Sequence, residues 1–316
     1  MTLPSTMRAL QVADLAPNFA GCAVAEVPVP EPGTGEALLK VRAAALGFPD
    51  LLMTEGKYQH RPDLPFTPGN DIAGEIVAFG DRDGENGRGL AVGDAVVATL
   101  GTGGFAQYAR CPVSALRRKP DGMAFDAAAA FGVAYLTAYV ALVRRADIRP
   151  GEWLLIHGAA GGVGLAAVDL GKALGARVIA ASASDAKLAA IERAYAPDAC
   201  VNVADGFREA VKALTGGGAD VIYDPVGGDI FDESTRCIAF GGRLLVVGFA
   251  SGRIATVPTN IPLIKGFSVV GVRAGEYGRR YPERGQENFD AIWAMAEAGE
   301  LTPHVHAALP LDAWRT

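Results

Sequence analysis

The stretch that decides the fold is 153–164, with the sequence WLLIHGAAGGVG. It begins as a continuous apolar strand, and the glycine-rich loop 158–164 follows directly and opens a predicted helix that runs to residue 174. A dinucleotide-binding fingerprint requires this setting, because glycines let the backbone approach a pyrophosphate and the helix N-terminus offers free N–H groups. We expect Gly161 to permit that approach and Gly164 to let the helix pack on the strand. A purely structural tight turn is the alternative interpretation.

The loop therefore supplies the first group of predicted cofactor-binding residues. They are Ala159, Ala160, Gly161, Gly162, Val163 and Gly164. Ala159 stands where the first glycine of the fingerprint would be. The positive end of the helix dipole is expected to favour the phosphates at this point.

The end of the next strand indicates which dinucleotide is bound. An NAD enzyme presents an acidic residue to the ribose about 20 residues past the fingerprint, and here that place is held by Ala183. A small neutral residue leaves room for a 2′-phosphate, to which Ser182 and Ser184 can donate hydrogen bonds and Lys187 can supply charge. These residues favour NADPH. Asp185 weighs against it, although the helix dipole explains an acid there and N-capping explains Ser184.

Apolar strands and helical stretches alternate through the middle of the chain. The strands that follow the fingerprint are RVIAAS, ACVNV, DVIYDPV, RLLVVGF and FSVVGVR. Continuous apolar strands between helices indicate a parallel sheet covered on both faces. We therefore predict that 126–273 is a doubly wound α/β domain. Asp224, in the turn after one of these strands, is expected to start a helix and to have no catalytic role.

The first third of the chain has a different texture. Short strands punctuated by glycine and proline predict an all-β, barrel-like unit, and they are MRALQV, CAVAEVPV, EALLKVRAAAL, DIAGEIVAFG, GDAVVATL and FAQYARCPV. After residue 273 we expect a charged loop at 275–285, an amphipathic helix at 287–298 and a strand at 304–311 that returns to the β unit. The predicted domains are thus 1–125 with 274–316, and 126–273.

Composition excludes several classes of protein. The chain has 316 residues, 50% of them hydrophobic, which excludes a disordered chain, and its net charge of −6 argues against a nucleic-acid or anionic-membrane partner. The uncharged run 127–143 contains Gly132 and ends at Arg144, so we expect a buried helix pair and no membrane span. The four cysteines are scattered, and no signal-peptide pattern opens the chain. These features predict a cytoplasmic protein.

Several stretches together with the glycine loop carry a specific resemblance. They are ALGFPDLLMTEGKY, LPFTPGNDIAGEIVAFG, GVAYLTAY, HGAAGGVGLAA, YDPVGG and LLVVGFASG, in this order. The chain resembles the zinc-independent branch of the medium-chain dehydrogenase/reductases, the NADPH:quinone oxidoreductase (zeta-crystallin-like) family, over almost its whole length. The resemblance implies an α/β protein with a GroES-like β-barrel catalytic domain and a Rossmann dinucleotide-binding domain.

The resemblance also implies roles for single residues. It makes Tyr58 the catalytic residue that points into the substrate cleft and places Thr137 at the nicotinamide end of the cofactor. The backbone of three residues is expected to run along the cofactor, namely Val247, Gly248 and Phe249. A half-buried aromatic without a catalytic role is an equal interpretation of Tyr58. Two departures from the family are Gly47, commonly Asn, and Val203, often Tyr.

The residues expected of a zinc enzyme are missing. A zinc alcohol dehydrogenase resembling this chain would have Cys near Gly47 and a His-Glu pair where Asn70 and Asp71 stand. We therefore expect no metal. Without a Lewis acid, reducing a quinone or a conjugated enone needs less help than oxidising an alcohol. An NADPH-dependent reductase is predicted, with a zinc-free alcohol or aldehyde dehydrogenase and a non-catalytic, crystallin-like NADPH-binding protein as alternatives.

The last strand of the predicted parallel sheet, 267–273, suggests a homodimer. It is apolar on both faces, and an unpaired apolar edge strand invites association. The resemblance agrees, because members of the family commonly join dinucleotide domains edge to edge. In the competing interpretation the charged loop 276–284 folds over this edge and keeps the chain monomeric.

Overall fold

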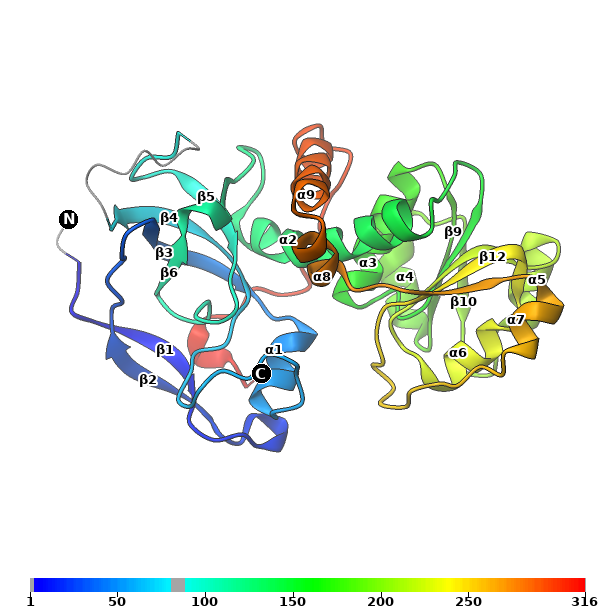
Figure 1. The fold of residues 1–316 in the computed structure, drawn as a ribbon, viewed down its shortest axis with the longest axis horizontal. Helices are drawn as coiled ribbons and strands as arrows, with labels where there is room; N and C mark the ends of the chain where they lie inside the picture. Colours follow the sequence, from blue (N-terminus) through cyan, green and yellow to red (C-terminus); the bar gives the residue numbers. More distant parts are fainter. Residues whose placement is uncertain (1–2, 81–88, 316) are drawn as a thin grey trace. The chain divides into compact units, whose positions relative to one another are not determined.

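The computed structural model describes residues 3–80 and 89–315, and Figure 1 shows its helices and strands. The chain forms two compact units. One consists of Met1–Val133 and Val305–Thr316, and the other of Ala134–His304. In the described residues the first unit contains two sheets and the second unit one, and each unit has its own hydrophobic core.

The second unit extends further along the chain than the sequence indicates. The prediction assigned 274–316 to the β domain, whereas helices α8 (Ala274–Arg280) and α9 (Pro282–Glu297) belong to the second unit. Hydrogen bonds from Arg144 to the side chains of Glu287 and Asn288 hold α9 there. The boundaries of the two units therefore differ from the predicted ones, and the contacts of α9 with Arg144 are of a kind that no periodicity reveals.

A parallel sheet forms the centre of the second unit, as predicted for a doubly wound domain. Its strands, in spatial order, are β10 (Ala199–Asn202), β9 (Arg177–Ser182), β8 (Trp153–Ile156), β11 (Ala219–Asp224), β12 (Ile238–Val246) and β13 (Ser268–Gly271). The chain runs outward from β8 to β10 and then, beginning again at β11, outward to β13. The strand order therefore reverses between β8 and β11, and such a switch point is where open α/β sheets bind ligands.

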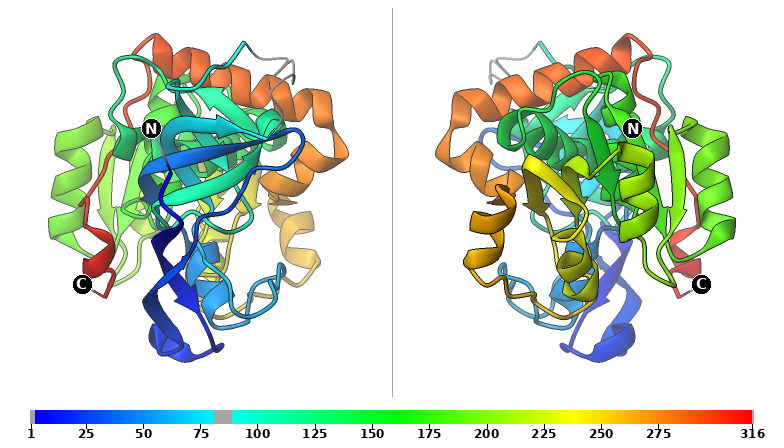
Figure 2. Two further views of the ribbon diagram at one scale, coloured as in Figure 1. Left: turned by 90° about the vertical axis from the view of Figure 1, so that its left-hand side faces the viewer. Right: turned by 90° about the vertical axis from the view of Figure 1, so that its right-hand side faces the viewer.

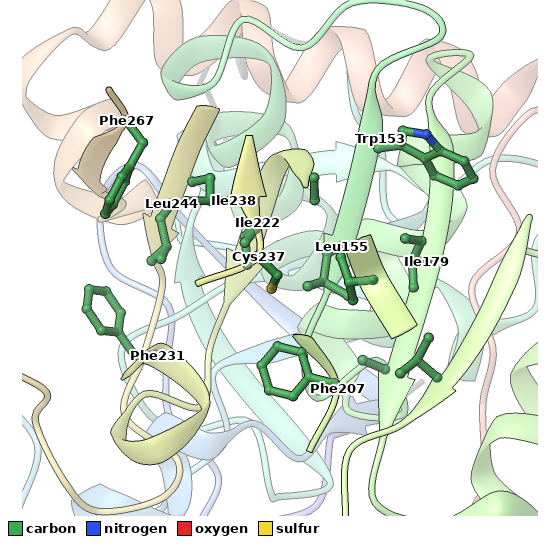
Figure 3. Packing of buried hydrophobic residues seen from close by; sticks show 14 residues of the cluster. Trp153, Leu155, Ile179, Phe207, Ile222, Phe231, Cys237, Ile238, Leu244 and Phe267 are labelled. Carbon is green, nitrogen blue, oxygen red and sulfur yellow. The ribbon is translucent and has the colours of Figure 1, made fainter. Parts of the chain in front are cut away.

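Helices lie on both sides of this sheet (Figure 2). One side has α5 (Arg208–Thr215), α6 (Gly228–Ser234) and α7 (Asn260–Lys265), and the other has α3 (Gly162–Ala173) and α4 (Asp185–Tyr195). Alternate residues of each strand face opposite sides. Leu155 belongs to the buried cluster with Phe207 and Phe231 (Figure 3), whereas a Cβ placed on Gly171 of α3 would lie 2.7 Å from Leu154. Both faces are therefore apolar, which explains the continuous apolar runs in the sequence.

The first unit is antiparallel. Its sheets have the orders β6-β3-β4-β5-β7 and β1-β2. The elements are β1 (Thr6–Val12), β2 (Cys22–Pro28), β3 (Glu36–Ala45), α1 (Phe48–Thr54), β4 (Asp71–Phe79), β5 (Ala95–Thr99), β6 (Tyr108–Pro112) and β7 (Leu116–Arg118), with short 3₁₀ turns η1 (Pro17–Phe19) and η2 (Val113–Ala115). The strands β1 to β6 match the predicted ones. The sequence did not reveal β7, because three residues are too few to show an alternating pattern.

The uncharged run 127–143 lies in one continuous helical segment and not in the expected helix pair. Helix α2 (Phe125–Tyr139) continues into a π-helical turn, η3 (Val140–Arg145). Within the described ranges this is the one helix long and apolar enough to span a membrane, and 44% of its most apolar window is buried inside the protein. Buried side chains such as Ala138 and Leu142 account for part of its apolar character, and a core helix passes the same test of length and composition.

The strand expected at 304–311 is absent, and this prediction is wrong. The segment is irregular up to the 3₁₀ turn η4 (Leu311–Ala313). Just before residue 304, the backbone of Thr302 bonds to side chains and not to a neighbouring strand. Its N–H donates to the carboxylate of Asp169 at 2.7 Å, and its carbonyl oxygen accepts from the hydroxyl of Tyr195 at 2.9 Å. Alternating sequence alone therefore did not produce a strand, because no ladder partner is present for it in the described part of the chain.

The prediction of a charged loop at 275–285 is also wrong, since α8 and the start of α9 occupy this stretch. Glu276 forms ion pairs with Arg279 and Arg280, at the three- and four-residue spacings that stabilise a helix. The charges therefore support a helix and do not mark an irregular loop.

The four cysteines are all free thiols. Cys22, Cys111 and Cys237 are buried, and Cys200 is half-buried. Burial raises the pKa of Cys111 and Cys237 to about 12. These two groups are therefore protonated at neutral pH.

Candidate functional site

The glycine loop 158–164 connects β8 to α3 at the switch point of the sheet. Gly158 has a φ of +55°, and the N–H of Gly161 donates to its carbonyl oxygen at 2.9 Å, which closes a tight turn. The N–H of Ala159 donates to the carbonyl oxygen of Ala181 in β9 at 3.1 Å. Backbone contacts therefore fix the loop between the first two strands without any polar side chain.

Gly164 is the point where α3 comes closest to this loop. A Cβ at this position would lie 2.2 Å from the carbonyl oxygen of Gly158 and 2.8 Å from the Cα of Ala159. No side chain fits at such distances. The position needs glycine for close packing of helix and loop, which is the role we expected for Gly164.

Gly161 and Gly162, in contrast, face open space. A Cβ on Gly162 would have no atom within 4 Å, and one on Gly161 would meet only the carbonyl oxygen of Gly158 at 3.4 Å. Gly161 has no side chain with which to cap α3, so the first N–H groups of the helix are left for another acceptor. A pyrophosphate fits this place, because it brings acceptors and negative charge to the positive end of the helix.

The turn between β9 and α4 contains the residues expected at the 2′ position of the ribose. Ser184 caps α4 by accepting from the N–H of Lys187 at 3.5 Å, and Ser182, which is buried, accepts from the N–H of Ser184 at 3.4 Å. Both hydroxyls thus have a structural role and can still donate a hydrogen bond. Ala183 and Lys187 are exposed. Within the described residues, no hydrogen bond or ion pair engages the ammonium group of Lys187.

Asp224 builds the loop at the end of β11. Its carboxylate accepts hydrogen bonds from the N–H groups of Val226 and Gly227 at 2.8 and 2.9 Å, and its carbonyl oxygen accepts from Val247 at 2.9 Å. Burial raises the pKa of Asp224, and the two backbone hydrogen bonds oppose that rise. The side chain therefore holds the loops after β11 and β12 together, which is a structural role and not a catalytic one.

The predicted cofactor residues after β12 lie in the loop that Asp224 holds. Val247 and Gly248 are half-buried, and Phe249 is 44% exposed. A Cβ on Gly248 would lie 3.0 Å from the carbonyl oxygen of Pro225, so this loop runs close against the previous one. The structure thus places three of the predicted groups at the carboxyl ends of β8, β9 and β12.

Two predicted residues belong to other elements of the chain. Thr137 is half-buried on α2, and in the described part of the chain no hydrogen bond joins it to the loops. Tyr58 belongs to the first unit, where its ring packs against a buried cluster that includes Met53 and Phe66. This contact corresponds to the aromatic packing role that the sequence left open for Tyr58.

Two carboxyl groups in the first unit had no role predicted from the sequence. Asp50 is buried and accepts hydrogen bonds from the N–H groups of Gly47 and Gly69 at 2.8 and 3.0 Å. Asp71 accepts from the hydroxyl of Thr99 at 2.8 Å. Burial raises the pKa of Asp71 to about 7, and the negative charge of Asp50 adds to this rise. The sequence did contain one signal for these two carboxyl groups. They lie close to Gly47 and Asn70, which stand where a zinc enzyme would have metal ligands.

The positions where a related zinc enzyme has its metal ligands carry no such ligands here. Gly47 has no side chain to offer, and its N–H is bonded to Asp50. Among residues 3–80 and 89–315, no group of three or more His, Cys, Asp or Glu side chains is placed to hold a metal ion.

Two family models match the chain, one in each unit. The alcohol dehydrogenase GroES-like domain matches residues 33–121, and the zinc-binding dehydrogenase family matches residues 162–293. The predicted combination of a GroES-like β domain with a Rossmann dinucleotide-binding domain is therefore confirmed.

Known proteins are similar over nearly the whole chain. A quinone oxidoreductase-like protein 2 homolog from Nematostella vectensis is 38% identical over 284 residues, which is 89% of this chain and 76% of that protein. The quinone oxidoreductase of Thermus thermophilus, solved also as a complex with NADPH, is 32% identical with a TM-score of 0.73 over 95% of this chain and 88% of that one. A mycobacterial protein complexed with NADPH is 27% identical with a TM-score of 0.87, covering 97% and 94% of the two chains.

The contrast between neighbouring glycines yields a first prediction. Gly164→Ala should lower the free energy of unfolding by about 1–3 kcal/mol, because its methyl group meets the backbone of the loop. Gly162→Ala, where a methyl group meets nothing, is the matched control and should change it by less than about 0.5 kcal/mol. Urea denaturation measures both. Equal losses for the two variants would show that the close approach at Gly164 does not limit stability.

The raised pKa of Asp71 yields a second prediction, on pH dependence. In the unfolded chain an aspartate loses its proton near pH 4, whereas in the folded protein this one loses it near pH 7. The contribution of Asp71 to stability is therefore full below about pH 4 and is lost as the pH rises to about 7, by at most about 1.4 kcal/mol per unit of pKa difference.

Asp71→Asn removes this titration, so the variant should gain stability relative to the wild type between pH 5 and pH 8. Urea denaturation at several pH values measures the difference, and Asp63→Asn, at an exposed aspartate, serves as the control. A difference between wild type and Asp71→Asn that stays constant across this range contradicts the prediction.

Proposed function

The chain belongs to the quinone oxidoreductase-like group of the medium-chain dehydrogenase/reductases, and we propose that it reduces a quinone or an α,β-unsaturated carbonyl with NADPH and without a metal. It is an oxidoreductase of the quinone reductase-like type.

The open, uncapped N-terminus of α3 beside Gly161 and Gly162 supports the proposal most strongly. Its N–H groups would bind the pyrophosphate. Lys187, exposed and unpaired within the described residues, would bind the 2′-phosphate, with the hydroxyls of Ser182 and Ser184 as further donors. When bound, NADPH supplies a hydride from its dihydronicotinamide ring.

The substrate class is proposed because the chain lacks the side chains that would hold a metal as a Lewis acid. Gly47 and Asn70 replace the cysteine and histidine of a zinc site, so a carbonyl or alcohol oxygen would have no metal to polarise it. Addition of hydride to a quinone or a conjugated enone delocalises the charge to a distant oxygen and needs less assistance. Tyr58 remains a proposed substrate-side residue, and Thr137 a proposed nicotinamide-side residue.

We also propose a small-molecule substrate and a cytoplasmic location. The net charge of −6 disfavours binding to nucleic acid or to an anionic membrane. The four free cysteines suit a reducing compartment, in which disulfides are rare.

A substrate panel tests the proposed function. NADPH oxidation is followed by its absorbance with quinones, enones, enoyl thioesters and aldehydes, each with and without a metal chelator. We expect turnover of quinones or enones that the chelator leaves unchanged. Turnover of aldehydes alone favours the dehydrogenase alternative, and loss of activity with the chelator, together with stoichiometric zinc by elemental analysis, overturns metal independence. Binding of NADPH without turnover of any compound favours the non-catalytic alternative.

Cofactor choice gives a further prediction. Lys187→Ala should weaken NADPH binding far more than NADH binding, because a charge-assisted hydrogen bond to phosphate contributes about 1.5–3 kcal/mol. Calorimetric titration of each dinucleotide measures this, and Lys212→Ala, at a lysine on α5, is the control. Equal losses for NADPH and NADH would remove the assignment of Lys187 to the 2′-phosphate.

A homodimer is proposed from the edge of the parallel sheet. In the described part of the chain, β13 has a neighbouring strand on one side only. Large apolar side chains near this edge are exposed, with Phe240 at 88%, Leu263 at 81% and Ile264 at 73%. The segment 276–284, which would cover the edge in the competing interpretation, forms helices. A second copy of the chain would pair with β13 and cover these side chains.

Val270→Lys, in β13, tests this assembly, because it places a charge in the proposed interface. Light scattering should give the mass of a dimer for the wild type and a mass near that of the monomer for the variant. Val92→Lys, at an exposed valine of the first unit, is the control and should leave the dimer intact. A monomeric wild type at micromolar concentration refutes the dimer. A Val270→Lys variant that keeps the mass of a dimer shows that the interface does not lie at β13.

A further inference from the structure

The turn between β9 and α4 carries one acidic side chain that would oppose NADPH. Asp185 is the first residue of α4 and follows the cap residue Ser184 directly. An acid at the end of this strand can accept the ribose hydroxyls of NADH, and it repels a 2′-phosphate. Asp185 and Lys187 lie in the same turn. The position of the Asp185 carboxylate therefore determines which of the two dinucleotides is preferred.

The side chain of Asn202 holds this carboxylate. Asn202 ends β10 and pairs in register with Ser182 at the end of β9, so the two strand ends are adjacent. Its amide nitrogen Nδ2 donates to Oδ1 of Asp185 at 2.6 Å. Asp185 is therefore bound toward the end of the neighbouring strand.

The orientation of the Asn202 amide is itself determined by a second contact. Its oxygen Oδ1 accepts from the N–H of Ala204 at 3.0 Å, and only the oxygen of an amide can accept from a backbone N–H. The NH₂ group must then face Asp185. The N–H of Val203 also donates to the carbonyl oxygen of Ser182 at 3.1 Å, which ties the loop after β10 to the end of β9.

We propose that Asn202 is a positioning residue that determines cofactor specificity. By binding Asp185 from β10, it keeps that carboxylate off the 2′ position of the adenosine ribose. Lys187, which has no such partner in the described part of the chain, is left to the 2′-phosphate. This inference rests on the proposed function, because it assumes that the adenosine end of the dinucleotide lies at this turn.

Dissociation constants of NADPH and NADH test the inference without any measurement of activity. In Asn202→Ala the carboxylate of Asp185 is released, so NADPH binding should weaken on the order of tenfold, as expected for one like-charge contact near a protein surface. NADH binding should be unchanged or tighter. Calorimetric titration of the purified protein with each dinucleotide gives the ratio of the two constants.

A double variant separates this role from simple damage to the loop. Asn202→Ala with Asp185→Asn should restore the NADPH-to-NADH ratio of the wild type to within about twofold, because the released group is then neutral. Asp185→Asn alone, the matched control, should change the ratio by less than about threefold, since its carboxylate is already engaged in the wild type.

An unchanged NADPH-to-NADH ratio in Asn202→Ala, which includes an equal loss of both dinucleotides, overturns the inference. A ratio that the double variant does not restore also overturns it. A wild type that binds NADH more tightly than NADPH overturns it as well, while leaving a reductase of this family in place. A wild type that binds neither dinucleotide removes the proposed function together with the inference.

Discussion

One close approach determines how the carboxyl edge of the parallel sheet is arranged. The carbonyl oxygen of Gly158 and the backbone of Gly164 are so near that a Cβ on Gly164 would lie 2.2 Å from that oxygen. This contact sets the distance between β8 and α3 and thereby the place of the first N–H groups of the helix. The N–H of His157 donates to Tyr223 in β11 and that of Ala159 to Ala181 in β9, so strands on both sides fix the loop. The other loops at this edge are therefore arranged around the fixed glycine loop 158–164.

The neighbouring loops are held by a common device, a polar side chain that accepts hydrogen bonds from backbone N–H groups. Asn202 accepts from the loop after β10, Asp224 from the loop after β11, and Glu233 from the first N–H groups at the start of α5, at distances between 2.7 and 3.0 Å. Such contacts order a binding edge before any ligand arrives, which reduces the cost of binding. Specificity then depends on which side chains these contacts leave available.

The sequence predicts those features that need particular residue types at regular spacing. The inner strands of the parallel sheet are buried on both faces and carry apolar residues at consecutive positions, so they could be located from the sequence. The glycine loop was recognisable because no other residue fits at Gly164. Apolar and polar residues alternate in the segment 304–311 as in a strand, but the segment lacks a ladder partner in the described residues. Its own sequence does not reveal this lack. The Asn202 contact with Asp185 joins residues 17 apart through the register of two strands, and the raised pKa of Asp71 depends on burial by distant segments. Contacts of this kind arise only from the tertiary structure.

The buried cysteines have a consequence for a protein that handles quinones or enones. Such compounds are electrophiles, and the thiolate is the form of cysteine that adds to them. Cys22, Cys111 and Cys237 are buried, and burial raises the pKa of all four thiols, that of Cys111 and Cys237 to about 12. The chain thus exposes very little reactive sulfur to compounds of the substrate class that we propose. The burial that builds the hydrophobic cores therefore also lowers the reactivity of these thiols toward such electrophiles.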